Sequence, residues 1–279
     1  MCLLALAIGA SARWPLVIAA NRDEHRQRPT QPLSTWTTDA GDTLMSGRDL
    51  RAGGTWLGST PGGRVALLTN VREAVPTTGR KSRGDLPLHW LTGRMDADTF
   101  WAQHDPADYG GFNLVIGDFQ RGQWIWASNR ESAGSKDHSL ISNTTRWQTR
   151  TLAPGIYGLS NALLDTPWPK TLALKAAMQT ALAQAHSSGQ EEDLSQPLWA
   201  ALARRERALL AELPQTGVAL ELEHALSSAH VDIPTRDYGT RCSTLMWVDT
   251  STGPGAFKAT LWEKTIGGDA TRLHWALQS

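Results

Sequence analysis

The second residue of the chain, Cys2, is the side chain best suited to covalent chemistry. Removal of the initiator Met1, which a small second residue permits, would leave Cys2 with a free α-amine. Such an amine has a pKa of about 7.7 to 8, so near neutral pH it can take the proton of the thiol on its own residue. Nucleophile and base would then share one residue without a catalytic histidine. The alternative is that Cys2 is a buried strand residue, as free cysteines commonly are.

Three apolar runs end in asparagine, at Asn21, Asn70 and Asn161. An amide at the end of a strand offers an N–H donor to a cleft, as the oxyanion of an acyl-transfer reaction requires. Each asparagine alone is more often a turn residue. Their recurrence beside charged residues favours a shared cleft.

Asn21 runs directly into a polar cluster with no turn residue between them: Arg22, Asp23, Glu24 and His25. Arg22 has a planar guanidinium whose N–H donors are fixed in direction, and it is expected to orient the nucleophile or a substrate carboxylate. Asp23 is expected to hold the α-amine. Glu24 is either a substrate-binding residue, as Asn21 is expected to be, or a solvated one. His25 is the candidate metal or haem ligand among the histidines.

Two other segments bring polar side chains to the same cleft. The segment 237–244, DYGTRCST, is expected to place Tyr238 and Arg241 at its mouth, although an ordinary turn would also explain Arg241. The segment 77–87, TTGRKSRGDLP, is a basic loop that opens a helix. Its backbone N–H groups and side chains, Arg83 in particular, could bind a phosphate or carboxylate, and a solvated loop is the alternative.

Apolar runs separated by turn residues predict the strands that would position these groups. Residues 2–9 and 14–21 read as a hairpin, as do 53–60 with 63–70 and 111–118 with 122–129. Residues 155–161 form another short strand. Three strands in succession are expected at the following positions: 243–250, 256–264 and 272–279.

Helical periodicity predicts helices at 85–93, 96–104, 166–186 and 196–213. Thr166 is the expected N-cap of the third helix, with Pro167 at its first position. Residues 187–196 read as a polar loop, and Pro214 would end the fourth helix. Antiparallel strand pairs with clustered helices between them indicate a layered α+β domain, expected to span residues 1–279 as one unit.

Composition excludes several classes of protein. Lysine plus arginine equals aspartate plus glutamate at 27 each, so no general nucleic-acid or anionic-membrane binder is indicated. The 2 cysteines provide no disulfide framework, and no histidine spacing indicates zinc. No apolar run is long enough to span a bilayer. The first residues lack a basic n-region and read as a buried strand rather than a signal peptide, so we expect a cytoplasmic protein.

The segment AANRDEHRQRP, 19–29, resembles the signature of the NRDE family, the homologues of transport and Golgi organisation protein 2. The resemblance extends in order over nearly the whole chain, through GGTWLGST, ALLTN, SRGDL, GFNLVIGD, YGLSNALLDTPWPK and YGTRCSTLMWVD.

The family is similar to N-terminal-nucleophile hydrolases, which implies a four-layer αββα sandwich with Cys2 as nucleophile. Its pattern resembles the choloylglycine hydrolase and penicillin V acylase group. By order along the chain, that resemblance assigns catalytic positions to Arg22, Asp23, Asn70, Asn161 and Arg241. This chain departs from those acylases by placing arginine and aspartate side by side, which leaves the roles of Asp23 and Glu24 open. Haem trafficking and lipid or acyl-CoA metabolism are also proposed for the family.

Three hypotheses follow. The first is a hydrolase of amide or thioester bonds that needs no cofactor. The second is a non-enzymatic carrier of haem or an acyl-CoA-like ligand in the same cleft, with tryptophan-rich walls suited to a flat or long apolar molecule. The third is a structural protein whose NRDE cluster braces a corner, although buried charge pairs are an inefficient means to stability. A small molecule is the expected partner, and the sequence leaves the oligomeric state open.

Overall fold

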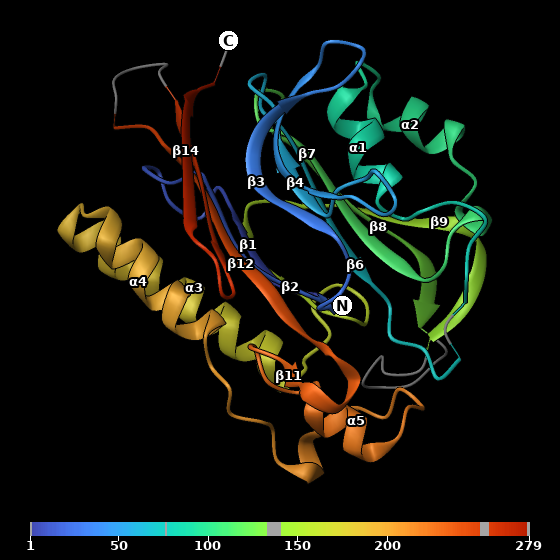
Figure 1. The fold of residues 1–279 in the computed structure, drawn as a ribbon. Helices are drawn as coiled ribbons and strands as arrows, with labels where there is room; N and C mark the ends of the chain where they lie inside the picture. Colours follow the sequence, from blue (N-terminus) through green and yellow to red (C-terminus); the bar gives the residue numbers. More distant parts are fainter. Residues whose placement is uncertain (1, 76, 133–140, 252–256, 278–279) are drawn as a thin grey trace.

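The computed structural model describes residues 2–75, 77–132, 141–251 and 257–277, and side chains 132–145 are outside that description. Two antiparallel sheets face each other, and helices cover the outer face of each (Figure 1). The layers therefore run helix, sheet, sheet, helix. The expected α+β class and four-layer αββα arrangement are confirmed.

The first sheet, sheet A, has the strand order β10-β1-β2-β12-β13-β14, with β11 paired to β12. Its strands are β1 (Cys2–Ile8), β2 (Leu16–His25), β10 (Gly155–Leu159), β11 (Asp232–Ile233), β12 (Tyr238–Asp249), β13 (Lys258–Thr265) and β14 (Ala270–Ala276). The predicted first hairpin is confirmed, as are the strands expected near the C-terminus. Ala256, Gln278 and Ser279 belong to those predictions and lie outside the described residues.

The second sheet, sheet B, has the strand order β3-β4-β5-β6-β7-β8-β9. Its strands are β3 (Thr30–Thr37), β4 (Thr43–Asp49), β5 (Leu57–Ser59), β6 (Arg64–Asn70), β7 (Phe112–Asp118), β8 (Gln123–Ser132) and β9 (Ile141–Thr151). The predicted pairs β5–β6 and β7–β8 are confirmed. Strand β3 was not predicted from the sequence because it is largely polar and only partly buried.

The pleat of β1 and β2 separates two apolar cores. Leu4, Leu6 and Ile18 point between the sheets, where they pack with sheet B residues such as Leu67 and Val115. Residues of opposite parity point to the other side. Leu3, Ala5, Val17 and Ala19 pack against α3 (Pro169–Ser188) and α4 (Glu191–Leu202). On the far side, α1 (Asp85–Thr92) and α2 (Ala97–Gln103) cover sheet B.

The helix boundaries differ from prediction. Trp168, not Thr166, is the N-cap residue of α3, and the helix begins at Pro169 rather than Pro167. Proline supplies the helical φ at either position, but the backbone N–H of Trp168 is bonded to the Thr166 carbonyl in a turn that precedes the helix.

The predicted loop 187–196 is wrong, because α3 continues to Ser188 and α4 begins at Glu191. Gly189 ends α3 in the left-handed conformation, with a φ of 71°. Three acidic residues then occupy the first turn of α4, where the helix dipole favours negative charge.

The predicted helix 196–213 ends instead at Leu202. Its last buried apolar side chains are Leu198 and Leu202, and the charged run that follows has no apolar face to bury. Short helices follow, η2 (Leu210–Glu212), α5 (Leu220–Ala225) and η3 (Pro234–Arg236), while η1 (Pro106–Asp108) precedes β7. No helix in the described part of the chain is both long enough and apolar enough to span a membrane.

Candidate functional site

Cys2 lies at the start of β1, directly opposite Arg22 of β2 in the antiparallel register. Opposed residues of neighbouring strands present their side chains on the same face of a sheet. Here that face is the one between the sheets, because Leu4 and Leu6 follow Cys2 at even positions. The N-terminal thiol and the guanidinium therefore share one end of the space between the two sheets.

That end opens into a cavity of about 460 Å³, the Cys2 cavity. Its described lining includes six residues singled out in the sequence: Cys2, Arg22, Asp23, Glu24, Asn70 and Arg83. The lining also includes Arg28, Asp49 and Trp56, which sequence reasoning missed. Trp56 and Arg28 do lie within the GGTWLGST and AANRDEHRQRP blocks, which was the available signal.

Arg22 is held rigidly, with only 5% of its surface exposed. Its guanidinium carbon lies 4.2 Å from the ring centroid of Trp56. It forms an ion pair with Asp49 at 3.5 Å and donates a hydrogen bond to the Thr30 hydroxyl at 3.4 Å. A guanidinium fixed by stacking and pairing provides a constant positive charge beside the thiol.

Asp23 and Glu24 have different surroundings. Asp23 is buried, and its carboxylate accepts a hydrogen bond from the Thr240 hydroxyl at 2.7 Å. Glu24 is partly exposed and accepts a hydrogen bond from the His25 backbone N–H at 2.8 Å. Burial opposes ionisation of Glu24, but that N–H and the charges of Arg22 and Arg28 lower its pKa overall.

Asn70 is the last residue of β6, as predicted, and lines the cavity. Asn161 lies two residues beyond the end of β10 and is fully buried. Its side-chain N–H donates to the Asn70 backbone carbonyl at 2.8 Å. The neighbouring Ser160 hydroxyl donates to the Cys2 carbonyl at 3.1 Å. Asn161 and Ser160 therefore connect the end of β10 to two cavity residues without lining the cavity themselves.

Asn21 is not at the end of its strand, because β2 continues to His25. Its parity differs from that of Arg22, so its amide points toward the helices. There it donates to the carbonyls of Leu202 and Ala229, each at 2.8 Å, and accepts from the Ser243 hydroxyl at 2.6 Å. Asn21 ties sheet A to the segments around α4 and is absent from the described cavity lining.

Three further predicted site residues lie outside the described cavity lining. His25 is exposed and packs edge-on against Tyr238, with ring centroids 5.2 Å apart. Tyr238 is buried and donates to the Asp23 backbone carbonyl at 2.9 Å. Arg241, in a bulge of β12, donates to the carbonyls of His25 at 2.7 Å and Arg28 at 3.1 Å. All three brace the backbone that carries Asp23 and Glu24.

Burial raises the pKa of the Cys2 thiol, as does the Asp23 carboxylate, whereas the Arg22 charge and the Asp23 backbone N–H lower it. The pKa of the Cys2 thiol is raised overall, so the thiol needs a base to become a nucleophile near neutral pH. The other cysteine, Cys242, pairs with Arg22 on the opposite side of β2 from Cys2. Both cysteines are free thiols, and burial raises the pKa of Cys242 well above its usual value.

A buried charge network lies beneath the site and was not predicted. Arg72 and Glu223 form an ion pair between side chains that are each 3% exposed. Lys170, at the start of α3, is also buried and donates to the Leu226 carbonyl at 2.9 Å. Burial lowers the pKa of Lys170 to about 8, although the charges of Asp23 and Cys2 act in the opposite direction. No group of three or more metal-ligating side chains occurs among the described residues.

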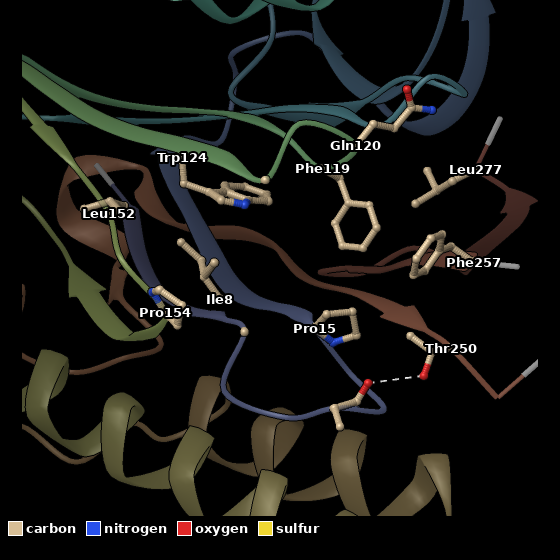
Figure 2. Close-up of a pocket in the computed structure, with 13 residues that line it drawn as sticks. Ile8, Pro15, Phe119, Gln120, Trp124, Leu152, Pro154, Thr250, Phe257 and Leu277 are labelled. Carbon is tan, nitrogen blue, oxygen red and sulfur yellow. Dashed lines mark hydrogen bonds between the residues drawn. The ribbon is translucent and has the colours of Figure 1, made fainter. Parts of the chain in front are cut away.

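A second cavity, of about 680 Å³, lies at the opposite end of the space between the sheets. Figure 2 shows Ile8, Phe119, Trp124 and Phe257 around it. Ile8 is the last residue of β1 and Cys2 the first, so the two cavities are separated by roughly 20 Å of strand. They share no described lining residue, and the inter-sheet core fills the space between them.

The model of the family described as Transport and Golgi organisation 2 matches residues 1–267. The chain is similar to the Transport and Golgi organization protein 2 homologs of Bos taurus and Homo sapiens. It is 32% identical to the bovine protein, covering 93% of this chain and 90% of that protein. It is 28% identical to the human one, covering 95% and 94% respectively.

Solved structures are similar at low sequence identity. One is an ortholog of N-acylethanolamine-hydrolyzing acid amidase from Caenorhabditis elegans, with a TM-score of 0.47, 9% identity, and coverage of 88% of this chain and 92% of that chain. Another is a conjugated bile acid hydrolase from Clostridium perfringens, with a TM-score of 0.48, 7% identity, and coverage of 98% and 92%.

Proposed function

The chain belongs to the Transport and Golgi organisation 2 family, and we propose that it hydrolyses amide or thioester bonds with Cys2 as its N-terminal nucleophile. The observation that carries the proposal is the position of Cys2, whose side chain opens into a cavity lined by Arg22, Asp23, Glu24 and Asn70. A free cysteine in a structural role would instead be buried away from any cavity, as Cys242 is, with 4% of its surface exposed. The proposal requires removal of Met1, which lies outside the described residues.

The base in this proposal is the α-amine of Cys2. No histidine occurs among the described residues that line the cavity, and burial keeps the pKa of the thiol high. An α-amine with a pKa of about 7.7 to 8 can accept the thiol proton at neutral pH. The carboxylate of Asp23, buried at the same end of β2, is suited to hold the resulting ammonium group.

The reaction then has two steps. The sulfur forms a bond to the substrate carbonyl carbon, and the carbonyl electron pair moves to oxygen. As that pair returns, the bond to nitrogen or sulfur breaks, and the α-ammonium donates its proton to the leaving group. Water, deprotonated by the α-amine, attacks the acyl-cysteine and releases the carboxylic acid and the free thiol.

The oxyanion needs donors that do not reorganise during the reaction. We assign this role to the side-chain amide of Asn70, which lines the cavity at the end of β6. The hydrogen bond from Asn161 to the Asn70 carbonyl holds that strand end in place. Arg22 supplies a fixed positive charge beside the sulfur.

The carrier hypothesis makes a different use of the same cavity. A haem carrier would need an axial ligand, and the exposed His25 is turned toward Tyr238 outside the described lining. His25 therefore does not fit as an axial ligand, which leaves the Cys2 thiol of the described lining for that role. A saturable Soret shift on haem titration, lost in Cys2→Ala, would favour the carrier function, and the absence of a saturable shift would exclude it for haem.

The proposed activity is tested by measuring the intact mass of the purified protein and its rate of hydrolysis. Purified protein should lack Met1, and it should hydrolyse acyl amides or thioesters. Cys2→Ala should abolish turnover, whereas Cys242→Ala, the matched control for loss of a thiol, should retain it. If Met1 is completely retained, the α-nitrogen of Cys2 remains in a peptide bond and cannot act as the base. Activity that survives in Cys2→Ala would exclude Cys2 as the nucleophile.

A further inference from the structure

We infer that the substrate combines a small acyl group with an anionic leaving half that bears carboxylate or phosphate, bound by Arg83 and Arg51. This inference rests on the proposed function and narrows it to one substrate class. Two properties of the Cys2 cavity carry it, its excess of positive charge and its lack of apolar space next to the thiol.

The charge is unevenly distributed around the cavity. Nine charged residues line it in the described chain, six basic and three acidic: Arg22, Arg28, Arg51, Arg80, Lys81 and Arg83 against Asp23, Glu24 and Asp49. Asp49 binds both Arg22 and Arg28, at 3.5 Å and 2.5 Å. Arg80 and Lys81 share Asp108, which lies outside the lining. The net charge stays positive after these pairings.

Arg51 and Arg83 have no carboxylate within 4.0 Å in the described part of the chain. Arg83 is half-buried, and within the described residues its side chain donates one hydrogen bond, from Nη1 to the Gly111 carbonyl at 3.0 Å. A guanidinium has five N–H donors, so most of those of Arg83 remain for a ligand. A partly desolvated arginine with spare donors favours a carboxylate or phosphate.

The loop that carries Arg83 is fixed in place. The Thr55 backbone N–H donates to the Gly84 carbonyl at 3.2 Å, and the Lys81 backbone N–H donates to the Asp108 carbonyl at 3.0 Å. A Cβ on Gly54 would come within 3.0 Å of the Gly84 backbone, so the two segments touch. Arg83 is therefore presented to the cavity by a preformed wall.

Apolar space beside the thiol is small. The recess behind Cys2, walled by Leu4, Leu67 and Trp56 among others, holds about 10 Å³. That volume is about what one water-sized group needs. The cavity itself has few apolar walls, mainly Trp56 and Leu68, and Arg22 covers the Trp56 ring. The larger apolar cavity of Figure 2 is separated by packed core and cannot receive a chain attached to Cys2.

Calorimetry on the Cys2→Ala protein tests this substrate class by binding alone, because the variant lacks the nucleophile and cannot turn a substrate over. Alanine, like cysteine, is small enough to permit removal of Met1, so the N-terminus is the same as in the parent. Four amides vary charge and acyl length independently: N-acetylglutamate, N-acetylethanolamine, N-octanoylglutamate and N-octanoylethanolamine. We expect N-acetylglutamate to bind most tightly. Its affinity should fall with added salt, because the attraction is between charges.

Arg83→Gln should weaken binding of N-acetylglutamate by about 10- to 100-fold, as loss of a charged hydrogen bond does. Arg51→Gln should weaken it less, because Arg51 is exposed to solvent. Arg94→Gln, at an exposed arginine outside the cavity lining, should leave binding unchanged. Circular dichroism and the Tm of each variant identify any that misfold.

Equal or tighter binding of N-octanoylethanolamine would overturn the inference, and so would an Arg83→Gln variant that binds N-acetylglutamate like the parent. Neither result bears on Cys2 as nucleophile. Conversely, anion-dependent binding by a protein whose wild-type form hydrolyses no amide or thioester would support the site and contradict the proposed function.

Discussion

Cys2 and Arg22 face each other across β1 and β2, and their side chains share the end of the inter-sheet space that opens into the Cys2 cavity. The guanidinium is fixed on Trp56 and Asp49, so its charge acts on the thiol from a constant position. This relationship gives Arg22 an effect that can be measured on the thiol itself.

Replacing Arg22 by glutamine should raise the pKa of the Cys2 thiol, because the Arg22 charge lowers that pKa in the folded protein. The rate of alkylation of Cys2 by iodoacetamide should then require a higher pH. Arg241→Gln is the matched control, since Arg241 binds backbone carbonyls outside the described lining. Identical pH profiles for both variants would show that Arg22 does not act on the sulfur.

Asn70 and Asn161 should differ in what their loss affects. Asn70→Ala should lower the rate of hydrolysis with little change in stability, because the side chain is half-buried at the cavity. Asn161→Ala should lower the free energy of unfolding by about 1–3 kcal/mol, because it removes a fully buried side chain and its hydrogen bond to the partly buried Asn70 carbonyl. Urea unfolding and steady-state kinetics separate the two effects, and equal stability losses would contradict the assignment.

The buried Arg72–Glu223 ion pair predicts a large structural effect. Glu223→Gln should destabilise the fold by about 3–5 kcal/mol, because it leaves the buried Arg72 charge without its carboxylate partner. The double variant Arg72→Met/Glu223→Gln should recover part of that loss, because it removes both charges and keeps a side-chain oxygen as acceptor for the Thr216 backbone N–H. A double-mutant cycle by chemical denaturation measures this coupling, and additive losses would contradict it.

His89 predicts a pH dependence of stability. Its Nδ1 lies 2.9 Å from Nε2 of His104, whose Nδ1 is bound to the Phe100 carbonyl at 2.8 Å. Burial and the neighbouring His104 lower the pKa of His89 below its usual 6.5. Its contribution to stability is therefore complete above pH 6.5 and is lost as the pH falls through the lowered folded-state pKa.

The Tm of the parent protein should accordingly decrease as the pH is lowered from about 7 to about 5, a range that contains the ordinary histidine pKa. His89→Gln should reduce that decrease. His186→Gln, at an exposed position on α3, should not alter the pH dependence. Unchanged slopes in both variants would show that the His89–His104 contact does not couple to protonation.

Local patterns in the sequence predicted most of the layers. The β1–β2 hairpin and the C-terminal strands follow from apolar runs that turn residues interrupt, and the register of β1 and β2 then brings Cys2 opposite Arg22. The strand β3 has no such run, because its outward face is solvated, and it was missed. The acidic start of α4 read as a loop because its apolar positions are sparse until Leu194.

The site was predictable only where sequence proximity coincides with spatial proximity. Arg22, Asp23 and Glu24 are consecutive and all line the cavity, whereas Asn21 is bonded to the segments around α4 and does not line it. Which parity faces the other sheet depends on packing between distant segments. The Arg72–Glu223 pair, separated by 151 residues, and the approach of Asp49 to Arg22 likewise depend on tertiary structure.

Peptide mapping after reaction with an electrophilic acyl probe tests the central claim most directly. The account predicts a chain that lacks Met1 and carries one acyl group, located on Cys2 and absent from Cys2→Ala. An adduct on Cys242 or any other residue that persists in Cys2→Ala, or a chain that retains Met1 and takes up no label, would contradict it.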